Sequence, residues 1–536
     1  MTEDKMRTRF PFTIFFSFLL LLNTQILFAQ VKVDDKLSIT HLKANLQVLA
    51  SDEFEGRETT TRGEKLASLF IASELEKYNV KPYGDNGTYF QNFDLLTSGY
   101  EIESKIALLD NLGSPISDFL FGDDFIRSGR GYADSSFAKQ TTGIVFAGYG
   151  LIQKEYNYDD YANIDVKGKT VLIFSGEPPR DKTNAAGFNL MNMINTDAKV
   201  KLAKEKGAVV VFIIVDERLK SFWNRFKEFG NQPSIAFISK EPQEVVKNIP
   251  VFTVGEKFVE KILSGEKYSY EKFNELLKAK ELFQSFEINK KIKFDIKPFS
   301  KIVSARNVIG LIEGTDPKLK NEFIVISAHY DHLGTRGGVV SNGADDDGSG
   351  TVAVLESMRM LSAERKNKRS ILAIFNTGEE KGLLGSRYAT ENGSFMKNVI
   401  VDINMDMVGR ESIDSLHCIG SNKLSTEFGN IVKEVNSETV KYNLNYKYDD
   451  PNDPNRFYSR SDHYNFARKG IPVVFFFDDM RADYHKPTDD VDKINFEKIL
   501  KTTMLSSNIA LQVANLDHKL VVDKKPEEEQ PRQRRQ

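Results

Sequence analysis

Four nearly continuous apolar runs constrain the fold of this chain more than any other feature. They are FIVISAH (323–329), SILAIFN (370–376), VIVDINM (399–405) and IPVVFFF (471–477). The segments between them, such as TVAVLESMRMLSAER, have helical periodicity. Solid apolar strands that alternate with helices are typical of a largely parallel sheet covered on both faces. The sequence therefore predicts an α/β domain over residues 295–517, with a mixed, mainly parallel sheet flanked by helices.

The part of the chain before residue 295 has a different hydrophobic pattern. Residues 36–130 begin with two helical patterns, HLKANLQVLASDEFEGR and RGEKLASLFIASELEKY, which we assign to the N-terminal part of the same domain. Residues 131–294 contain short β-rich runs such as TTGIVFAGYGL and AVVVFIIV, without a cluster of His and acidic residues. This block is interpreted as an inserted β-rich domain. The tail, 518–536, is charged, contains proline and is predicted to be disordered.

The first 29 residues are predicted to be an export signal. Three basic residues precede the apolar stretch FPFTIFFSFLLLLNTQILFAQ, and the small residue Ala29 stands at a plausible cleavage point. A retained membrane anchor is the alternative, since the stretch approaches the length of a span. No later segment is long and apolar enough to cross a membrane. We therefore expect an exported protein, periplasmic or extracellular, without a stable membrane anchor after signal cleavage.

The composition excludes several other classes of protein. The 73 basic and 76 acidic residues nearly cancel, so no field of one sign favours nucleic acid or an anionic membrane surface. Cys418 is the single cysteine, which excludes an internal disulfide, a Cys-based zinc site and an Fe–S cluster. Because Cys418 stands in a strand-like segment, it is interpreted as a small buried hydrophobe rather than a nucleophile.

Residues with metal-binding or catalytic chemistry follow the predicted strands. Functional groups in open α/β sheets gather beyond the carboxyl ends of the strands, so these side chains should share one rim. GADDDGSG adds three aspartates just before a predicted helix, with glycines that allow a tight backbone. The candidates are His329, Asp331, Asp345, Asp346, Asp347, Glu379, Glu380, Asp406 and His485.

Each of these patterns has an ordinary structural explanation when taken alone. An isolated His-x-Asp is mostly structural, and paired glutamates usually begin a solvated helix. GADDDGSG resembles a turn with a helix cap, or a calcium loop without the EF-hand spacing. Four separate patterns on one rim make a metal site the better interpretation. Two imidazoles with several carboxylates and no thiolate match the ligands of catalytic zinc, and one bridging carboxylate could hold two ions.

Five strings carry a resemblance to a known family. AHYDHLG, GADDDGSG, TGEEKGLLGS, NMDMVG and YHKPTDD resemble the signatures of the aminopeptidase Y family of zinc metallopeptidases, in clan MH. The resemblance covers roughly residues 38–110 and 300–510. The inserted block resembles a protease-associated (PA) domain. The resemblance to the aminopeptidase Y family implies a zinc-peptidase globule with a mixed, mainly parallel eight-stranded sheet and two Zn²⁺ ions per chain.

The resemblance also implies a role for each residue. His329 and Asp406 would bind one zinc ion, Glu380 and His485 the other, and Asp346 would bridge them. Glu379 would be the general base, and Asp331 would orient His329. Tyr458 sits where some relatives place a tyrosine that steadies the tetrahedral oxyanion, although a packing role fits it equally well.

The expected function is hydrolysis of peptide or protein substrates, with release of N-terminal amino acids. A carboxypeptidase or dipeptidase of the same clan is the alternative within hydrolases. From another class, the chain could be a non-catalytic binding protein that works through its PA domain. That alternative predicts loss of a ligand or of Glu379, and none is lost. The residue preferred at the cleavage site, the native metal and the oligomeric state do not follow from the sequence.

Overall fold

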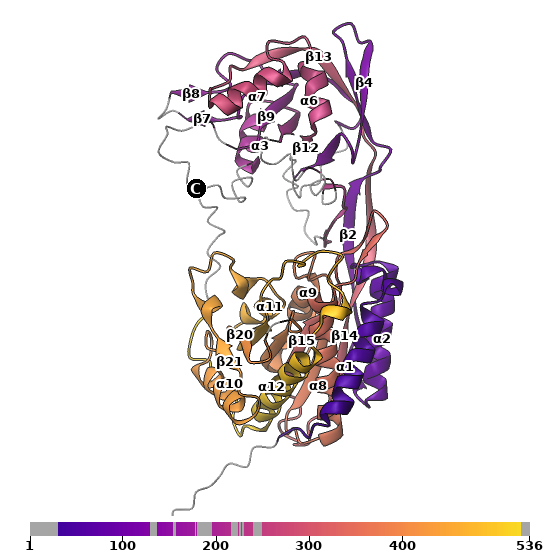
Figure 1. The fold of residues 1–536 in the computed structure, drawn as a ribbon, viewed down its shortest axis with the longest axis vertical. Helices are drawn as coiled ribbons and strands as arrows, with labels where there is room; N and C mark the ends of the chain where they lie inside the picture. The colour runs from indigo at the N-terminus through magenta and orange to yellow at the C-terminus, as the bar shows by residue number, and fades with distance from the viewer. Residues whose placement is uncertain are drawn as a thin grey trace, which may run out of the picture.

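The computed structural model describes residues 30–128, 137–153, 157–176, 178, 196–215, 223, 227, 230–238, 249–410 and 412–526. The predicted export signal lies outside these residues, as do the last ten residues of the predicted disordered tail. Two β-sheets form two lobes, one above the other in Figure 1. None of the helices in the described ranges has the length and apolar character needed to cross a membrane.

The first lobe is built on a mixed sheet of ten strands within the described residues. Its order is β11-β2-β14-β18-β15-β19-β22-β20-β21, and β1 pairs with β14. The strands are β1 (Lys81–Pro82), β2 (Phe90–Tyr100), β11 (Ser234–Phe237), β14 (Pro298–Ile312), β15 (Phe323–His329), β18 (Ser370–Asn376), β19 (Val399–Met405), β20 (Ser415–Ile419), β21 (Asn443–Asn445) and β22 (Val473–Phe477). The sheet exceeds the eight strands that the family resemblance implied, and three of the ten, β1, β11 and β21, have four residues or fewer.

The centre of this sheet is parallel, as the apolar runs predicted. β18, β15, β19 and β22 run side by side in one direction. His329 at the end of β15 is level with Asn376 at the end of β18, and Met405 of β19 is level with Phe476 of β22. The four carboxyl ends therefore meet at one edge, which is where the candidate residues follow the strands.

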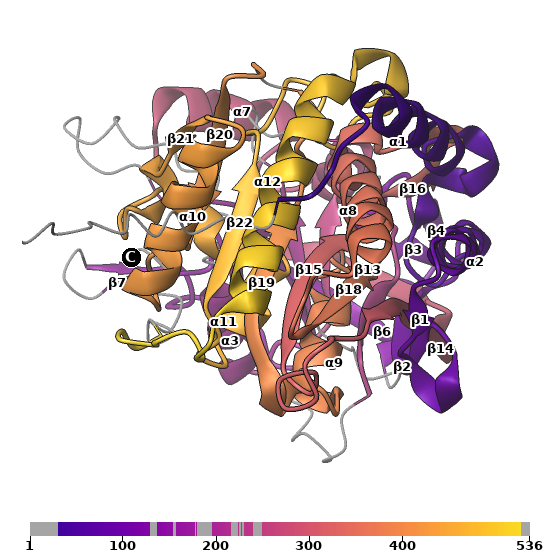
Figure 2. The same cartoon turned by 90° about the horizontal axis from the view of Figure 1, so that it is seen from below.

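Helices cover both faces of the first sheet because alternate strand residues point to opposite sides. Ile324 and Ile326 of β15 pack with α1, α8 and α12 in one core, whereas Val325 packs with α9 and α11 in another. In Figure 2, α8 and α12 lie in front of the central strands. The helices of this lobe are α1 (Asp35–Leu49), α2 (Arg62–Lys77), α8 (Gly350–Glu364), α9 (Leu384–Asn392), α10 (Thr426–Glu438), α11 (His463–Ala467) and α12 (Phe496–Asn515).

The second lobe contains an eight-stranded sheet in the order β4-β3-β13-β6-β9-β10-β12-β5. The strands are β3 (Lys105–Leu109), β4 (Pro115–Leu120), β5 (Phe125–Arg127), β6 (Thr141–Phe146), β9 (Thr170–Phe174), β10 (Val210–Ile214), β12 (Val251–Val254) and β13 (Phe286–Asp295). The helices of this lobe within the described residues include α3 (Thr196–Glu205), α6 (Glu256–Leu263) and α7 (Tyr270–Ala279). A separate antiparallel pair, β7 (Ile152–Gln153) and β8 (Tyr158–Asp159), lies between β6 and β9 in the sequence.

The membership of strands in the two sheets does not follow the predicted domain boundaries. The second sheet takes its first strand at Lys105, inside the range that we assigned to the first domain, while β11 of the inserted block pairs with β2 of the first sheet. The chain enters the second lobe between β2 and β3 and returns between β13 and β14. The ranges 36–130, 131–294 and 295–517 remain predictions.

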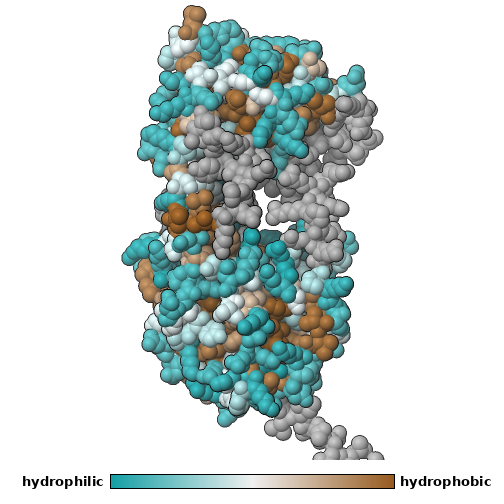
Figure 3. Space-filling model, turned by 180° about the vertical axis from the view of Figure 1, so that it is seen from behind, coloured by the Kyte–Doolittle hydropathy of each residue, from teal (hydrophilic) through white to brown (hydrophobic). Residues whose placement is uncertain are grey.

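The face of the molecule in Figure 3 carries mostly hydrophilic side chains over both lobes.

Candidate metal centre

The predicted metal-binding residues converge at the carboxyl edge of the first sheet. His329 is the last residue of β15, Asp406 directly follows β19, and Glu379 and Glu380 follow β18. His485 lies in the long segment after β22, and Asp346 lies in the short element η6 (Ala344–Ser349) that leads into α8. Five segments that are separate in the sequence thus supply one cluster.

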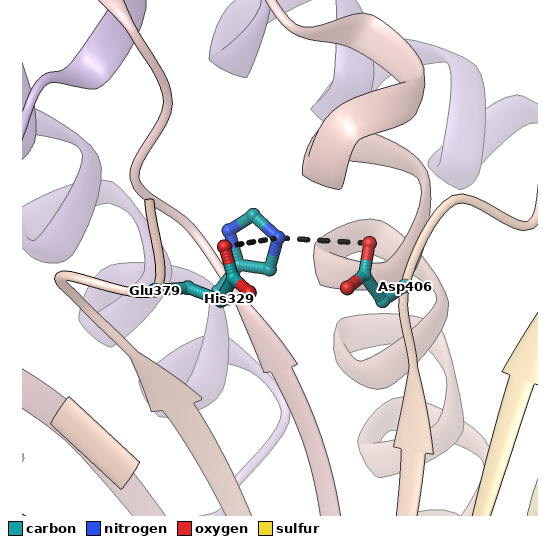
Figure 4. A group of neighbouring side chains, drawn as sticks. All are labelled: His329, Glu379 and Asp406. Carbon is teal, nitrogen blue, oxygen red and sulfur yellow. Dashed lines mark ion pairs between the residues drawn. The ribbon is translucent and has the colours of Figure 1, made fainter. Parts of the chain in front are cut away.

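His329 is the centre of a first group of side chains. Its Nε2 lies 3.4 Å from Asp346 Oδ1, 3.6 Å from Asp406 Oδ1 and 3.9 Å from Glu379 Oε2. The carboxylates of Glu379 and Asp406 approach this nitrogen from opposite sides (Figure 4). The imidazole is 1% exposed, and its Nδ1 is 3.1 Å from the carbonyl oxygen of Asp331.

A second group surrounds Glu380. His485 Nε2 lies 3.2 Å from Glu380 Oε2 and 3.2 Å from Asp346 Oδ2. A further imidazole, that of His332, has its Nδ1 2.9 Å from Glu380 Oε1 and 3.9 Å from Asp346 Oδ2. His332, Asp346 and Glu380 are close enough together to hold a metal ion, as are His329, Glu379 and Asp406.

Asp346 faces both groups, whereas the carboxylates of its two neighbours, Asp345 and Asp347, accept hydrogen bonds from other backbone amides. Asp347 accepts hydrogen bonds from the backbone of His329, Gly350 and Met407, and Asp345 accepts one from Gly409. The backbone amide of Asp346 is itself held by Asp489. Of the three aspartates, only the middle one points one carboxylate oxygen at His329 and the other at His485.

The electrostatics of the cluster are dominated by close pairs of opposite charge. Burial alone would lower the pKa of His485, but the Glu380 and Asp346 carboxylates raise it to about 10. Burial would raise the pKa of Glu380, yet the imidazoles of His485 and His332 bring it down to about 2. The pKa of Asp346 is likewise held well below its usual value, against burial, by His329 and His485. The site therefore strongly favours cations among its carboxylates.

Glu379 differs from the other carboxylates. Burial raises its pKa well above the usual value, and Glu380 and Asp406 add to this effect. Its backbone amide donates to Asp331 Oδ1, and Asp331 Oδ2 accepts from the hydroxyl of Thr59. Asp331 was predicted to orient His329, and its carbonyl oxygen does lie nearest to the ring, while its carboxylate holds the turn that carries Glu379.

Tyr458 lies at some distance in the chain from these groups, in the short helix η9 (Phe457–Ser459). Its ring packs beside His463 and Tyr464 and under the ammonium of Lys423. These contacts describe a packing environment, and an oxyanion role for Tyr458 remains a prediction.

The residues fit a pair of zinc ions. Zinc–ligand bonds of about 2.0–2.2 Å place tetrahedral ligand atoms about 3.3 Å apart, which matches the 3.2–3.6 Å separations around both groups. Several buried atoms have no hydrogen-bond partner within the described part of the chain: Asp346 Oδ2, Glu380 Oε1 and His485 Nε2. Buried polar atoms are rarely left unpaired, so these atoms are arranged for a cation.

Two residues at the site were missed in the sequence. His332 is fully buried against Glu380, although AHYDHLG contains it three residues after His329. Arg57, in the string ASDEFEGR, is 1% exposed and donates to the carbonyls of Tyr330, Leu49, Asn342 and Gly343. It places a buried positive charge beneath the carboxylates and ties the ends of β15 and of the loop before η6 together.

Comparison with known proteins places these features in context. Residues 307–510 match the model of Peptidase family M28. A probable leucine aminopeptidase of Arthroderma otae is 27% identical over 209 residues, which are 37% of this chain and 56% of that protein. Leucine aminopeptidase 1 of Blastomyces gilchristii is 29% identical over 227 residues, 38% of this chain and 56% of the relative. The chain thus spans about half the length of these curated relatives.

Solved structures share the fold over a much larger part of the chain. An aminopeptidase from Aneurinibacillus sp. strain AM-1 is 19% identical, with a TM-score of 0.53 over 92% of this chain and 98% of that chain. A zinc aminopeptidase from Bacillus subtilis is 20% identical, with a TM-score of 0.51 over 88% and 94%. The likeness therefore extends beyond the segment that the family model matches and includes the second sheet.

Proposed function

We propose that this chain is a two-zinc aminopeptidase of the aminopeptidase Y type that removes N-terminal residues from peptides. The observation that carries the proposal is the position of Asp346, whose Oδ1 lies 3.4 Å from His329 and whose Oδ2 lies 3.2 Å from His485. One carboxylate between two imidazole groups is the arrangement that a two-metal hydrolase needs.

The comparisons support this proposal from two directions. The segment that carries all the candidate ligands matches a peptidase family, and the curated relatives that align with it are leucine aminopeptidases. One of the structures with the same fold is a zinc aminopeptidase.

The proposed ligands fall into two sets that share Asp346. His329 and Asp406 would hold one zinc ion, and Glu380 and His485 would hold the other. Zinc ions bound there would supply Lewis acidity towards the peptide carbonyl and would lower the pKa of a water ligand. Of the three carboxylates around His329, that of Glu379 is the most distant, at 3.9 Å against 3.4 and 3.6 Å, and we assign it another role.

Glu379 is proposed as the general base. Its carboxylate is largely buried beside both ligand sets, and its raised pKa suits a group that takes a proton from the attacking water and gives it to the leaving amine. Asp331 fixes the backbone of Glu379 through the hydrogen bond to its amide. The nearby carboxylates would hold the free α-amine of the substrate, which explains a preference for N-terminal residues. Tyr458 is proposed to steady the oxyanion.

The test compares the wild-type protein with Glu379→Gln, by zinc content and by hydrolysis of a panel of aminoacyl-nitroanilides. We expect two zinc ions in both proteins and a loss of kcat of about 10²–10⁴-fold in the variant. Glu266→Gln is the matched control, since Glu266 is a nearly buried glutamate of the second lobe that pairs with Lys290 at 2.7 Å. It should retain both zinc and activity.

The alternatives predict different results in the same experiment. Cleavage of N-acylated or C-terminal substrates, with no free-amine substrate cut, would favour a carboxypeptidase or another exopeptidase. A wild-type protein that binds no zinc would contradict the proposal and favour a binding protein. Tyr458→Phe tests the oxyanion role, which predicts a fall in kcat with unchanged KM.

We also propose that the second lobe is a PA domain and that the protein is exported after cleavage near Ala29. The support for the first is the eight-stranded sheet between β2 and β14, and for the second the sequence of residues 1–29. N-terminal sequencing of the protein from the culture medium and the periplasm tests the export. An intact N-terminus in the membrane fraction would instead indicate a retained anchor.

A further inference from the structure

His332 is the fully buried imidazole at the second group that the ligand assignment leaves without a role. It follows the end of β15, three residues after His329, and is 0% exposed. Within the described residues, neither ring nitrogen makes a hydrogen bond of ordinary geometry, although Nδ1 lies 2.9 Å from Glu380 Oε1. Burying a polar imidazole costs free energy that an aliphatic side chain of similar size would avoid. The position therefore calls for an explanation in terms of its neighbours.

The Glu380 carboxylate is enclosed between two imidazoles. Oε1 lies 2.9 Å from His332 Nδ1, whereas Oε2 lies 3.2 Å from His485 Nε2. The ring centroids of the two histidines are 6.0 Å apart, with the planes nearly perpendicular. Oε2 also belongs to the set of atoms, with Asp346 Oδ2 and His485 Nε2, that has tetrahedral zinc spacing. The oxygen that faces His332 is thus the one turned away from His485.

The backbone around His332 holds its ring in place. A Cβ atom at Gly343 would lie 2.4 Å from Cγ of His332, so the loop before η6 packs directly on the ring. The amide of His332 donates to the carbonyl of Arg57 at 3.3 Å, and the Arg57 guanidinium donates to the Gly343 carbonyl at 2.9 Å. The ring is clamped between two segments that Arg57 joins, so it is a fixed support for the carboxylate.

We propose that His332 is a positioning residue for the second zinc site: its Nδ1 abuts Glu380 Oε1 and thereby holds Oε2 towards the ion shared with Asp346 and His485. This inference rests on the proposed two-zinc function. Residues that orient a metal ligand in this way typically contribute 10–100-fold to metal affinity. The atom of Asp346 that His332 approaches, at 3.9 Å, is Oδ2, which faces His485 rather than His329. The effect of His332 should therefore fall mainly on one of the two ions.

The experiment measures both zinc-binding steps by competition with a chromophoric chelator in wild type, His332→Leu and His332→Asn. Leucine fills the buried space without a polar atom, whereas the Asn amide can place a donor near the position of Nδ1. We expect His332→Leu to weaken one zinc ion by about 10–100-fold and leave the other unchanged, and His332→Asn to recover most of the loss. The double variant His332→Leu with His485→Ala identifies the ion: the single remaining ion should bind as in His485→Ala alone.

Two controls separate this inference from folding and from the function itself. His417→Gln removes another buried histidine of the first lobe, on β20, and should bind both ions as wild type does. Circular dichroism of each metal-free variant verifies the fold. Equal weakening of both ions, unchanged affinity in His332→Leu, or tighter binding in Leu than in Asn would overturn the role of His332. A wild-type protein that binds fewer than two zinc ions would instead overturn the proposed function.

Discussion

Two buried aspartates, one in each lobe, show how differently the two sheets handle charge. Asp160 of the second lobe is 4% exposed, and protein donors satisfy its carboxylate: the amides of Tyr149 and Leu151 and the hydroxyl of Tyr158. Asp346 of the first lobe is equally buried at 4%, yet its Oδ2 has no hydrogen-bond donor within the described ranges. The Asp160 carboxylate stabilises a loop through hydrogen bonds, whereas the Asp346 carboxylate has an oxygen available to bind a cation.

The cores differ in the same sense. The second lobe packs a cluster of aromatic rings around Phe212, Phe252 and Phe258. The main core of the first lobe is largely aliphatic, and it supports a rim of buried carboxylates and imidazoles. All seven histidines of the sequence lie outside residues 105–295. The stability of the second lobe should therefore depend little on metal or on histidine titration, whereas that of the first should depend on both.

The largest difference is expected when the two aspartates are removed in turn. Asp346→Ala should lose both zinc ions, because it takes a ligand from each, and activity should fall by at least about 10⁴-fold. Asp160→Ala should keep two zinc ions per chain and most of the activity, although it leaves three donors of its loop unpaired. Zinc content and nitroanilide hydrolysis measure both. A variant at Asp346 that retains one ion at full affinity would contradict a bridging carboxylate.

A cavity in the aromatic core should affect only the second lobe. Phe212→Ala removes a fully buried ring and should lower the free energy of unfolding of that lobe by about 4 kcal/mol. Trp223, the single tryptophan, packs beside Gly255 in the same lobe, so its fluorescence reports the transition. Zinc affinity should not change. The control is Phe375→Ala, in β18 of the first lobe, because Phe375 is as fully buried as Phe212. It should not change the unfolding midpoint that Trp223 fluorescence reports.

Chelation reverses this pattern. At free zinc about 100-fold above the dissociation constant, each bound ion adds about 2.7 kcal/mol to stability, and the first lobe alone should lose this stabilisation in a chelator. Calorimetry should show a transition that moves down with chelator, while the midpoint of Trp223 fluorescence stays constant. An equal shift of both signals would mean that the lobes unfold together.

The smallest expected effect is a loss of stability in acid through His463. Burial lowers the pKa of His463 to about 3, and its Nε2 lies 2.9 Å from the carbonyl of Tyr458. Below pH 6.5 the unfolded chain takes up a proton that the folded chain does not, so stability is lost as the pH falls from 6.5 towards 3. Between pH 7 and pH 5 the loss should be about 2 kcal/mol.

The comparison of wild type with His463→Gln at these two pH values isolates this contribution, because other titrating groups are common to both proteins. Denaturant unfolding of the zinc-loaded proteins provides the measurement. If the two proteins lose the same stability between pH 7 and pH 5, His463 is not held neutral. The second lobe, which has no histidine, should change little over this range.

The sequence predicted the first lobe well because its signals are local. The apolar runs at 323–329 and 399–405 are strands β15 and β19 with the bounds expected, and TVAVLESMRMLSAER forms most of α8. Cys418 lies fully buried in β20, and burial raises its pKa to about 12, in keeping with a small hydrophobe. The helix that begins after Thr61 is capped by the Thr61 side chain.

The boundaries of the second lobe were harder to predict because sheet membership is a matter of long-range pairing. β2 and β3 follow each other closely, yet β2 pairs with β14 of one sheet and β3 with β13 of the other. Nothing in their local sequence states that choice. His332 and Arg57 were missed for the same reason, since their neighbours Glu380 and Gly343 are distant in the chain.

By itself the sequence determined the kinds of residue at the site and the edge of the sheet on which they gather. Strand periodicity and the polarity of a parallel sheet are enough for His329, Glu379 and Asp406, which follow apolar runs, whereas GADDDGSG is located by the helix that it precedes. The family resemblance named Asp346 among the aspartates of GADDDGSG, but only the tertiary structure gives the physical reason why it faces His329 and His485. Only the tertiary structure places His332 against Glu380. The placement of the three aspartates depends on hydrogen bonds across the fold: the amides of Gly409 and Met407 donate to Asp345 and Asp347, and Asp489 accepts from the amide of Asp346. No local pattern encodes these long-range contacts.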